Sequence, residues 1–281
     1  MGLAYTRGGS GPPLVLFHGV GHRRQAWDVV IDRLTPHRDV IAVDLPGHGE
    51  SPPLDVTGRS VLEALAGDVI GLLDQLGLDR PHIAGNSLGG LIALEAGLFG
   101  RAASVTALSP AGFWRSELEL RYIKGVFRGM QALGRRIQPI APKLARSPAG
   151  RTVLYATIVN RPGRMSPRQA EGDLAAFLAA KPALDLILAA AAPYYGEIPA
   201  HVPVTIGWGS KDRLLSPREA LVARQRLPHA RFVRLPGCGH VPMTDDPELV
   251  ATVLLRGSSR PAAGPGGPSP ATARADAAPP P

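Results

Sequence analysis

Short apolar runs alternate with stretches of helical periodicity along most of this chain. The runs contain few polar side chains, which is typical of strands buried on both faces of a parallel sheet. They fall at residues 14–17, 40–43, 83–84, 103–108, 202–209 and 232–235. Between them apolar residues recur at spacings of three and four, as from Trp27 to Leu34 and from about Ser60 to Leu76. We therefore predict an α/β fold with a mostly parallel central sheet and helices on both faces.

The alternation stops in the middle of the chain. Residues 113–197 have helical periodicity, clearest from Tyr122 to Ile137, and contain no run that resembles a strand. We expect residues 1–112 and 198–256 to form one core, with 113–197 as a helical insertion. Residues 257–281 consist largely of Gly, Ala, Pro, Ser and Thr without a large apolar side chain, so we predict a disordered tail there.

A candidate nucleophile lies between one predicted strand and the next helix. Ser87 stands at the centre of Gly85-Asn86-Ser87-Leu88-Gly89, after an apolar run and before a helical stretch. Glycines two residues before and after a serine allow a sharp turn that lifts its hydroxyl out of the sheet. The first amides of the helix would then face a developing oxyanion. The competing interpretation is a glycine-rich turn with an incidental serine.

A serine nucleophile requires a base, and the base requires an acid that orients it. His240 lies on a glycine-rich loop after the predicted strand 232–235, and Asp212 follows the strand that ends near Gly209. The order serine, aspartate, histidine is the one expected for this kind of turn. Asp245 and Asp246 are alternative acids, although they follow the histidine on its own segment.

Five sequence blocks occur in the order that they have in one superfamily. They are LVLFHGVG at 14–21, VIAVDLPGHGES at 40–51, GNSLGG at 85–90, GWGSKDRLLSP at 207–217 and GCGHVP at 237–242. From Ala4 to about Leu255 the chain resembles the α/β-hydrolase superfamily. This resemblance implies an α/β-hydrolase fold in which the helical insertion forms a lid over the site.

The resemblance also implies a role for each candidate residue. Ser87 would be the nucleophile, His240 the general base and then acid, and Asp212 the residue that orients His240. The backbone amides of Val20 and Leu88 would form the oxyanion hole. For His18 and His48 we expect structural roles, and for Asp44 hydrogen bonds with backbone amides.

The expected reaction is hydrolysis of a carboxylic ester, lactone or thioester, without a metal or organic cofactor. We expect a small-molecule ester substrate that is apolar or anionic. Other members of the superfamily that the chain resembles hydrolyse carbon-carbon bonds of ring-fission dienoates, or act as cofactor-free haloperoxidases through perhydrolysis. Val241 and Pro242 follow His240 where the carbon-carbon hydrolases commonly have an aromatic residue, which disfavours that chemistry. Epoxide and haloalkane hydrolysis use an aspartate at the position of Ser87. The non-enzymatic alternative is a ligand receptor that kept the triad.

Composition narrows the classes of protein further. A chain of 281 residues with 44% hydrophobic content can form one large core. Its apolar runs are much shorter than the roughly 20 residues of a membrane-spanning helix. The first residues lack the pattern of a secretory signal, so we expect a cytoplasmic location. Cys238 is the only cysteine, which excludes an internal disulfide, and we expect it to be a small loop residue rather than a nucleophile.

The net charge of +8 is concentrated in the helical insertion. Residues 113–197 carry 13 Lys and Arg against 6 Asp and Glu, and no acidic residue lies between Arg121 and Arg168. A basic amphipathic helix can contact an anionic membrane or a charged partner. The alternative is that its apolar face covers the substrate pocket while its arginines are solvated. Nucleic-acid binding is not expected, because no recognised nucleic-acid module accompanies the charge. The pattern does not indicate an oligomeric state.

Overall fold

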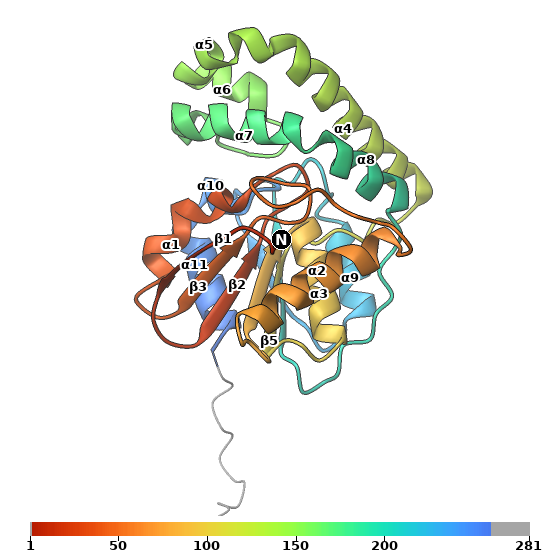
Figure 1. Ribbon diagram of the computed structural model, residues 1–281. Helices are drawn as coiled ribbons and strands as arrows, with labels where there is room; N and C mark the ends of the chain where they lie inside the picture. The colour runs from red at the N-terminus through yellow and green to blue at the C-terminus, as the bar shows by residue number, and fades with distance from the viewer. Residues whose placement is uncertain (1, 260–281) are drawn as a thin grey trace, which may run out of the picture.

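The computed structural model describes residues 2–259, and a seven-stranded sheet forms its centre (Figure 1). The strand order is β1-β3-β2-β4-β5-β6-β7, and every neighbouring pair is parallel except β1 and β3. The mostly parallel sheet is therefore confirmed. Its strands are β1 (Tyr5–Gly9), β2 (Pro13–Phe17), β3 (Asp39–Val43), β4 (His82–Asn86), β5 (Ser104–Leu108), β6 (Val204–Gly209) and β7 (Arg231–Leu235).

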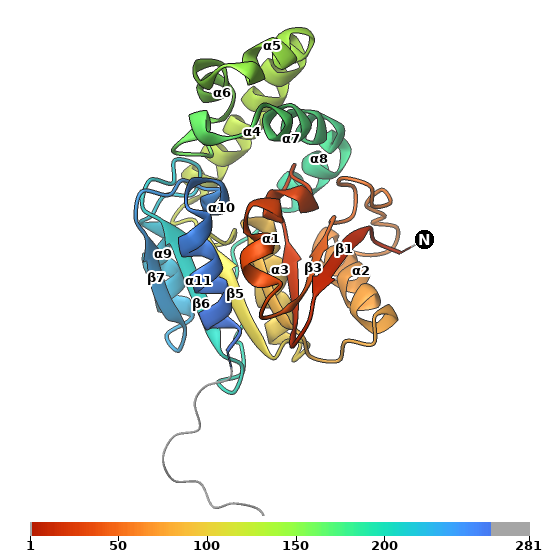
Figure 2. The same cartoon turned by 90° about the vertical axis from the view of Figure 1, so that its left-hand side faces the viewer.

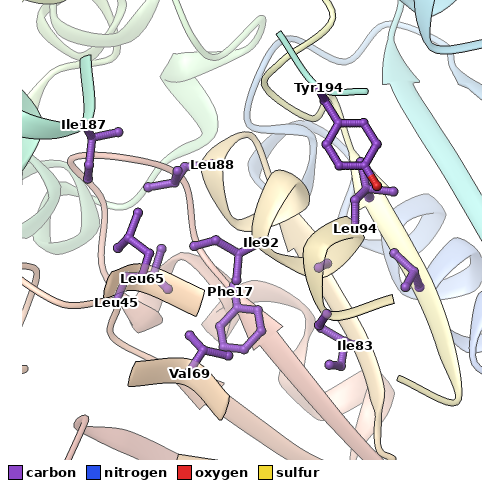
Figure 3. Close-up of a cluster of buried hydrophobic side chains, with 14 of the residues drawn as sticks. Phe17, Leu45, Leu65, Val69, Ile83, Leu88, Ile92, Leu94, Ile187 and Tyr194 are labelled. Atoms are coloured by element: carbon purple, nitrogen blue, oxygen red, sulfur yellow. The ribbon is translucent and has the colours of Figure 1, made fainter. Parts of the chain in front are cut away.

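Both faces of the sheet are buried, which explains the continuous apolar runs. In β2, Val15 and Phe17 join one core while Leu14 and Leu16 join the other, as the two-residue period of a strand requires. Helices α2, α3 and α9 contribute to the first core, and α1 and α11 to the second (Figure 2). Figure 3 shows part of the first core around Phe17. The core helices are α1 (Asp28–Leu34), α2 (Val61–Gln75), α3 (Leu88–Leu98), α9 (Glu219–Arg226), α10 (Pro242–Asp245) and α11 (Pro247–Gly257).

The chain between β5 and β6 forms helices without a strand, and these helices lie beyond the carboxyl ends of the parallel strands (Figures 1 and 2). At Gly134 helix α4 approaches α7 closely, since a Cβ there would lie 3.0 Å from Leu178 Cδ2. Within residues 2–259 no helix is long and apolar enough to cross a bilayer. The helices of this segment are α4 (Glu117–Ile137), α5 (Ala141–Arg146), α6 (Pro148–Tyr155), α7 (Pro167–Ala179) and α8 (Lys181–Ala190).

The folded core extends beyond its predicted end at residue 256. Helix α11 continues to Gly257, and Ser258 is buried. The Arg38 side chain donates to Ser258 Oγ at 2.9 Å and to its carbonyl oxygen at 2.9 Å. The predicted end at residue 256 was therefore too early. The local sequence pattern gave no sign of these bonds, because Arg38 is distant from Ser258 in the sequence. Residues 260–281, the rest of the predicted tail, lie outside the described residues.

Candidate active site

Ser87 occupies the turn that joins β4 to α3, and its backbone is strained. Its φ of 56° and ψ of −115° are rare for a residue with a side chain. Two glycines make the turn possible: a Cβ on Gly85 would lie 2.1 Å from the carbonyl oxygen of Gly89, and one on Gly89 would lie 2.2 Å from that of Phe17. The Ser87 amide donates to the Leu108 carbonyl at 2.9 Å. The predicted strand, sharp turn and helix around this serine are therefore confirmed.

The loop that follows β2 lies directly against the serine. A Cβ on Gly19 would lie 3.3 Å from Ser87 Cβ. His18 braces this loop, because its Nδ1 bonds the Gly19 carbonyl at 2.8 Å and its Nε2 accepts from the Leu45 amide at 3.0 Å. Burial lowers the pKa of His18 well below its ordinary value, so the ring is neutral. A neutral ring with both nitrogens bonded has the structural role expected for His18.

The two proposed oxyanion residues border the same space as the serine. Val20 and Leu88 line one cavity together with Ser87. Leu88 is the first residue of α3, so its amide has no acceptor within the helix and lies at the positive end of the helix dipole. This arrangement is chemically suited to a developing negative charge on a substrate oxygen.

His240 and Asp212 come together from the loops after β7 and β6. His240 Nδ1 bonds Asp212 Oδ2 at 2.9 Å, and both side chains are buried. The other oxygen of Asp212 accepts the amides of Leu214 and Leu215 at 2.9 and 2.8 Å, which fixes the carboxylate. A ring that donates from Nδ1 to a carboxylate presents Nε2 as a proton acceptor. The pair can therefore act as an oriented base.

The alternative acids have other partners. Asp245 is 3% exposed, and its carboxylate accepts the amides of Gly239, Asn160 and Arg161 at 2.7, 2.9 and 2.6 Å. It thereby joins the loop of His240 to the segment between α6 and α7. Asp246 caps α11 by accepting the Leu249 amide at 3.0 Å. Asp212 is the carboxylate that bonds the histidine.

Sequence reasoning missed a second fastening of the histidine loop. Asn86 is buried directly before the nucleophile, and its Nδ2 donates to the carbonyl oxygens of His240 at 2.9 Å and Leu108 at 3.0 Å. A polar side chain at the end of a buried strand was the available signal. Asn86 thus ties the base's loop to the strand that carries the nucleophile.

Three further polar residues near the site have structural roles. Burial lowers the pKa of His48, whose Nδ1 bonds the Pro46 carbonyl at 2.9 Å. Burial raises the pKa of the Cys238 thiol to about 12, so this group stays protonated and is a poor nucleophile. Asp44 accepts the amides of Arg24 and Glu50 at 2.6 and 3.0 Å, as expected.

Two apolar cavities meet at the serine. The first, about 170 Å³, extends from Ser87 along α3 and is covered by α4 and the end of α8. The second, about 120 Å³, lies among α4, α6 and α7 and also borders His240. Phe127 of α4 lines both cavities, so the apolar face of this basic helix roofs the site. Among the described residues, no lysine or arginine lines either cavity.

Comparisons with known proteins agree with this fold. Residues 14–253 match the model of the Alpha/beta hydrolase family. An uncharacterized protein of Mycobacterium tuberculosis is 30% identical over 268 residues, which cover 90% of this chain and 77% of that protein. An epoxide hydrolase of the same species is 33% identical over 207 residues, covering 68% of this chain and 91% of that protein.

A solved structure with a similar fold is a membrane phospholipase A described as a bacterial virulence factor. It superposes with a TM-score of 0.70 at 27% sequence identity, over 91% of this chain and 83% of that chain. Because the family model spans most of the sequence and the fold agrees with it, this protein belongs to the alpha/beta hydrolase family.

Proposed function

We propose that this protein is a serine hydrolase that cleaves a carboxylic ester, lactone or thioester through an acyl-enzyme on Ser87. One observation carries the proposal: Ser87 lies on a strained turn where two apolar cavities meet, and the second cavity is bordered by a histidine that bonds a buried aspartate. An ester has a substituent on each side of its carbonyl, so two cavities that meet at one nucleophile suit it. The similarity to a phospholipase adds support for ester cleavage.

The mechanism follows from the hydrogen bonds around His240. Nε2 takes the proton of Ser87 while Oγ attacks the carbonyl carbon, and Asp212 stabilises the imidazolium that forms. The amides of Val20 and Leu88 hold the oxyanion. The alcohol leaves with the proton from His240. Water then attacks the acyl-enzyme with His240 again as base, and Ser87 is restored.

The rival chemistries fit these residues less well. Ser87 stands where epoxide hydrolysis in this family uses an aspartate, although an epoxide hydrolase is among the relatives. A ring-fission dienoate brings a carboxylate into the site, yet no lysine or arginine lines either cavity among the described residues. A buried charge without a partner is costly. We therefore favour substrates without a negative charge over the anionic ones, which were the other expectation from the sequence.

A panel of p-nitrophenyl esters of rising chain length, assayed beside a ring-fission dienoate, tests the proposal. Ester turnover that disappears in Ser87→Ala supports it. Turnover of the dienoate alone would assign the site to carbon-carbon hydrolysis. Binding of an ester without any turnover would favour the receptor interpretation.

A further inference from the structure

One acidic side chain lines the first cavity without a partner. Glu95 of α3 is 8% exposed and borders this space together with Ser87, Leu88 and Leu91. Within the described residues its carboxylate has no hydrogen bond and no ion pair, and its oxygens are open to the cavity rather than fully enclosed by protein atoms. The proposed mechanism does not use it. A buried carboxylate on a mostly apolar wall is costly unless a ligand supplies a donor.

The position of Glu95 sets how far from the reacting carbonyl such a donor would lie. Leu88, Leu91 and Glu95 follow one another at spacings of three and four, so they lie on one face of α3. Glu95 follows Ser87 by eight positions in the sequence, which corresponds to about 12 Å along a helix axis. The carboxylate therefore borders the part of the cavity remote from the nucleophile, and a short acyl group would not reach it.

The surroundings of Glu95 select for a donor and against a second acid. Burial raises the pKa of Glu95, since no described cation neutralises it. Tyr194 lines the same cavity, and the nearby charge of Glu95 adds to burial in raising the pKa of the Tyr194 hydroxyl. This end of the cavity thus combines an acceptor with a tyrosine that stays protonated.

We propose that Glu95 is a specificity-determining residue that binds a hydrogen-bond donor, a hydroxyl or an ammonium group, at the far end of the substrate's acyl chain. The proposal rests on the assignment of Ser87 as the nucleophile of ester hydrolysis. A carboxylate can accept from either donor, whereas a terminal carboxylate on the chain would be repelled. A medium-length acyl chain with a terminal donor is therefore the substrate class that fits this cavity.

The test compares p-nitrophenyl esters of equal chain length that end in methyl, hydroxyl, ammonium or carboxylate groups, from butanoate to dodecanoate. At the length that reaches Glu95, kcat/KM should be about tenfold or more higher for at least one donor-ended chain than for the methyl-ended chain. The carboxylate-ended chain should be the poorest substrate. Glu95→Met should remove the donor preference, and Glu95→Gln should keep a preference for hydroxyl but lose one for ammonium.

Two controls separate this proposal from the one on which it rests. p-Nitrophenyl acetate is too short to reach Glu95, so each chain's kcat/KM is divided by that for acetate in the same variant, and circular dichroism shows whether Glu95→Met is folded. Glu171→Met removes an exposed carboxylate from α7 and should leave all preferences unchanged. Hydrolysis of the acetate with equal kcat/KM for methyl-ended and donor-ended chains at every length would overturn the role of Glu95. Failure to hydrolyse any ester would instead overturn the proposed function.

Discussion

Asp245 fastens the loop of His240 to the helical insertion, and replacing it by alanine measures that connection. Its carboxylate accepts the buried amide of Gly239 at 2.7 Å and the partly buried amides of Asn160 and Arg161 at 2.9 and 2.6 Å. A buried donor left without a partner costs about 1 to 3 kcal/mol, and water can partly replace the acceptor at the two half-buried amides. We therefore expect Asp245→Ala to lower the free energy of unfolding by about 3 to 5 kcal/mol.

The assay is urea unfolding together with kcat for a short ester. Asp246→Ala is the matched control. Among the described residues the Asp246 carboxylate accepts only the Leu249 amide, as the cap of α11, and its loss should cost about 1 kcal/mol. Asp245→Ala should also lower kcat, since the position of His240 depends on its loop, whereas Asp246→Ala should not. Equal losses of stability in the two variants, with unchanged kcat in both, would refute the fastening role.

Four other outcomes follow from particular contacts. Asp212→Asn should lower kcat by up to about 10⁴-fold, which is less than the loss in Ser87→Ala, because it disturbs the His240 tautomer but leaves the nucleophile in place. Equal losses of kcat in steady-state kinetics would contradict this order. Burial raises the pKa of Glu219 to about 8, so the folded state keeps a proton that the unfolded state releases above the ordinary pKa of a glutamate, and stability falls as pH rises between these two values. Glu219→Gln should therefore raise Tm by several degrees more at about pH 9 than at about pH 5. A Tm difference that is the same at both pH values would contradict this prediction. Phe127→Asp should reduce turnover of a neutral ester at least about tenfold, because it places a charge between the two cavities. If α4 only roofs the site, wild-type protein should co-sediment equally little with anionic and zwitterionic vesicles. Salt-sensitive binding to anionic vesicles alone would instead show that the exposed arginines of α4 contact a membrane. Protein truncated after Arg256 should melt below protein truncated after Ser259, because it loses the bonds of Ser258 with Arg38, and equal Tm values would show that these bonds contribute nothing.

Local patterns predicted the sheet and the turn at Ser87 because both features constrain runs of neighbouring residues. Apolar runs such as 14–17 are buried on both faces, and Gly85 and Gly89 stand where a Cβ would collide with backbone. The partners themselves can be distant, as Phe17 is from Gly89, but each feature leaves a pattern among neighbouring residues. The same reasoning placed Asp212 and His240 at one edge of the sheet, because the carboxyl ends of parallel strands share an edge.

Long-range partners could not be predicted in this way. The sequence pattern places Asn86 at the end of a strand, but its side-chain amide donates to the His240 carbonyl, 154 residues away. Asp245 reads as a possible acid for the histidine, yet it accepts amides from the insertion. Glu95 reads as one polar residue of a helix, and its environment depends on how α4 and α8 cover the cavity. Side-chain packing between distant segments decides each case, and periodicity contains no information about it.

Covalent labelling of Ser87 tests the central claim most directly. A p-nitrophenyl alkylphosphonate resembles the tetrahedral intermediate, and attack by an activated serine forms an Oγ–P bond while p-nitrophenolate leaves. Peptide mapping by mass spectrometry should find one adduct, on the peptide that contains Ser87, together with loss of ester turnover. Ser87→Ala should form no adduct, and His240→Ala should react far more slowly because its serine lacks a base. An adduct on another residue, or ester turnover that persists in Ser87→Ala, would contradict the account.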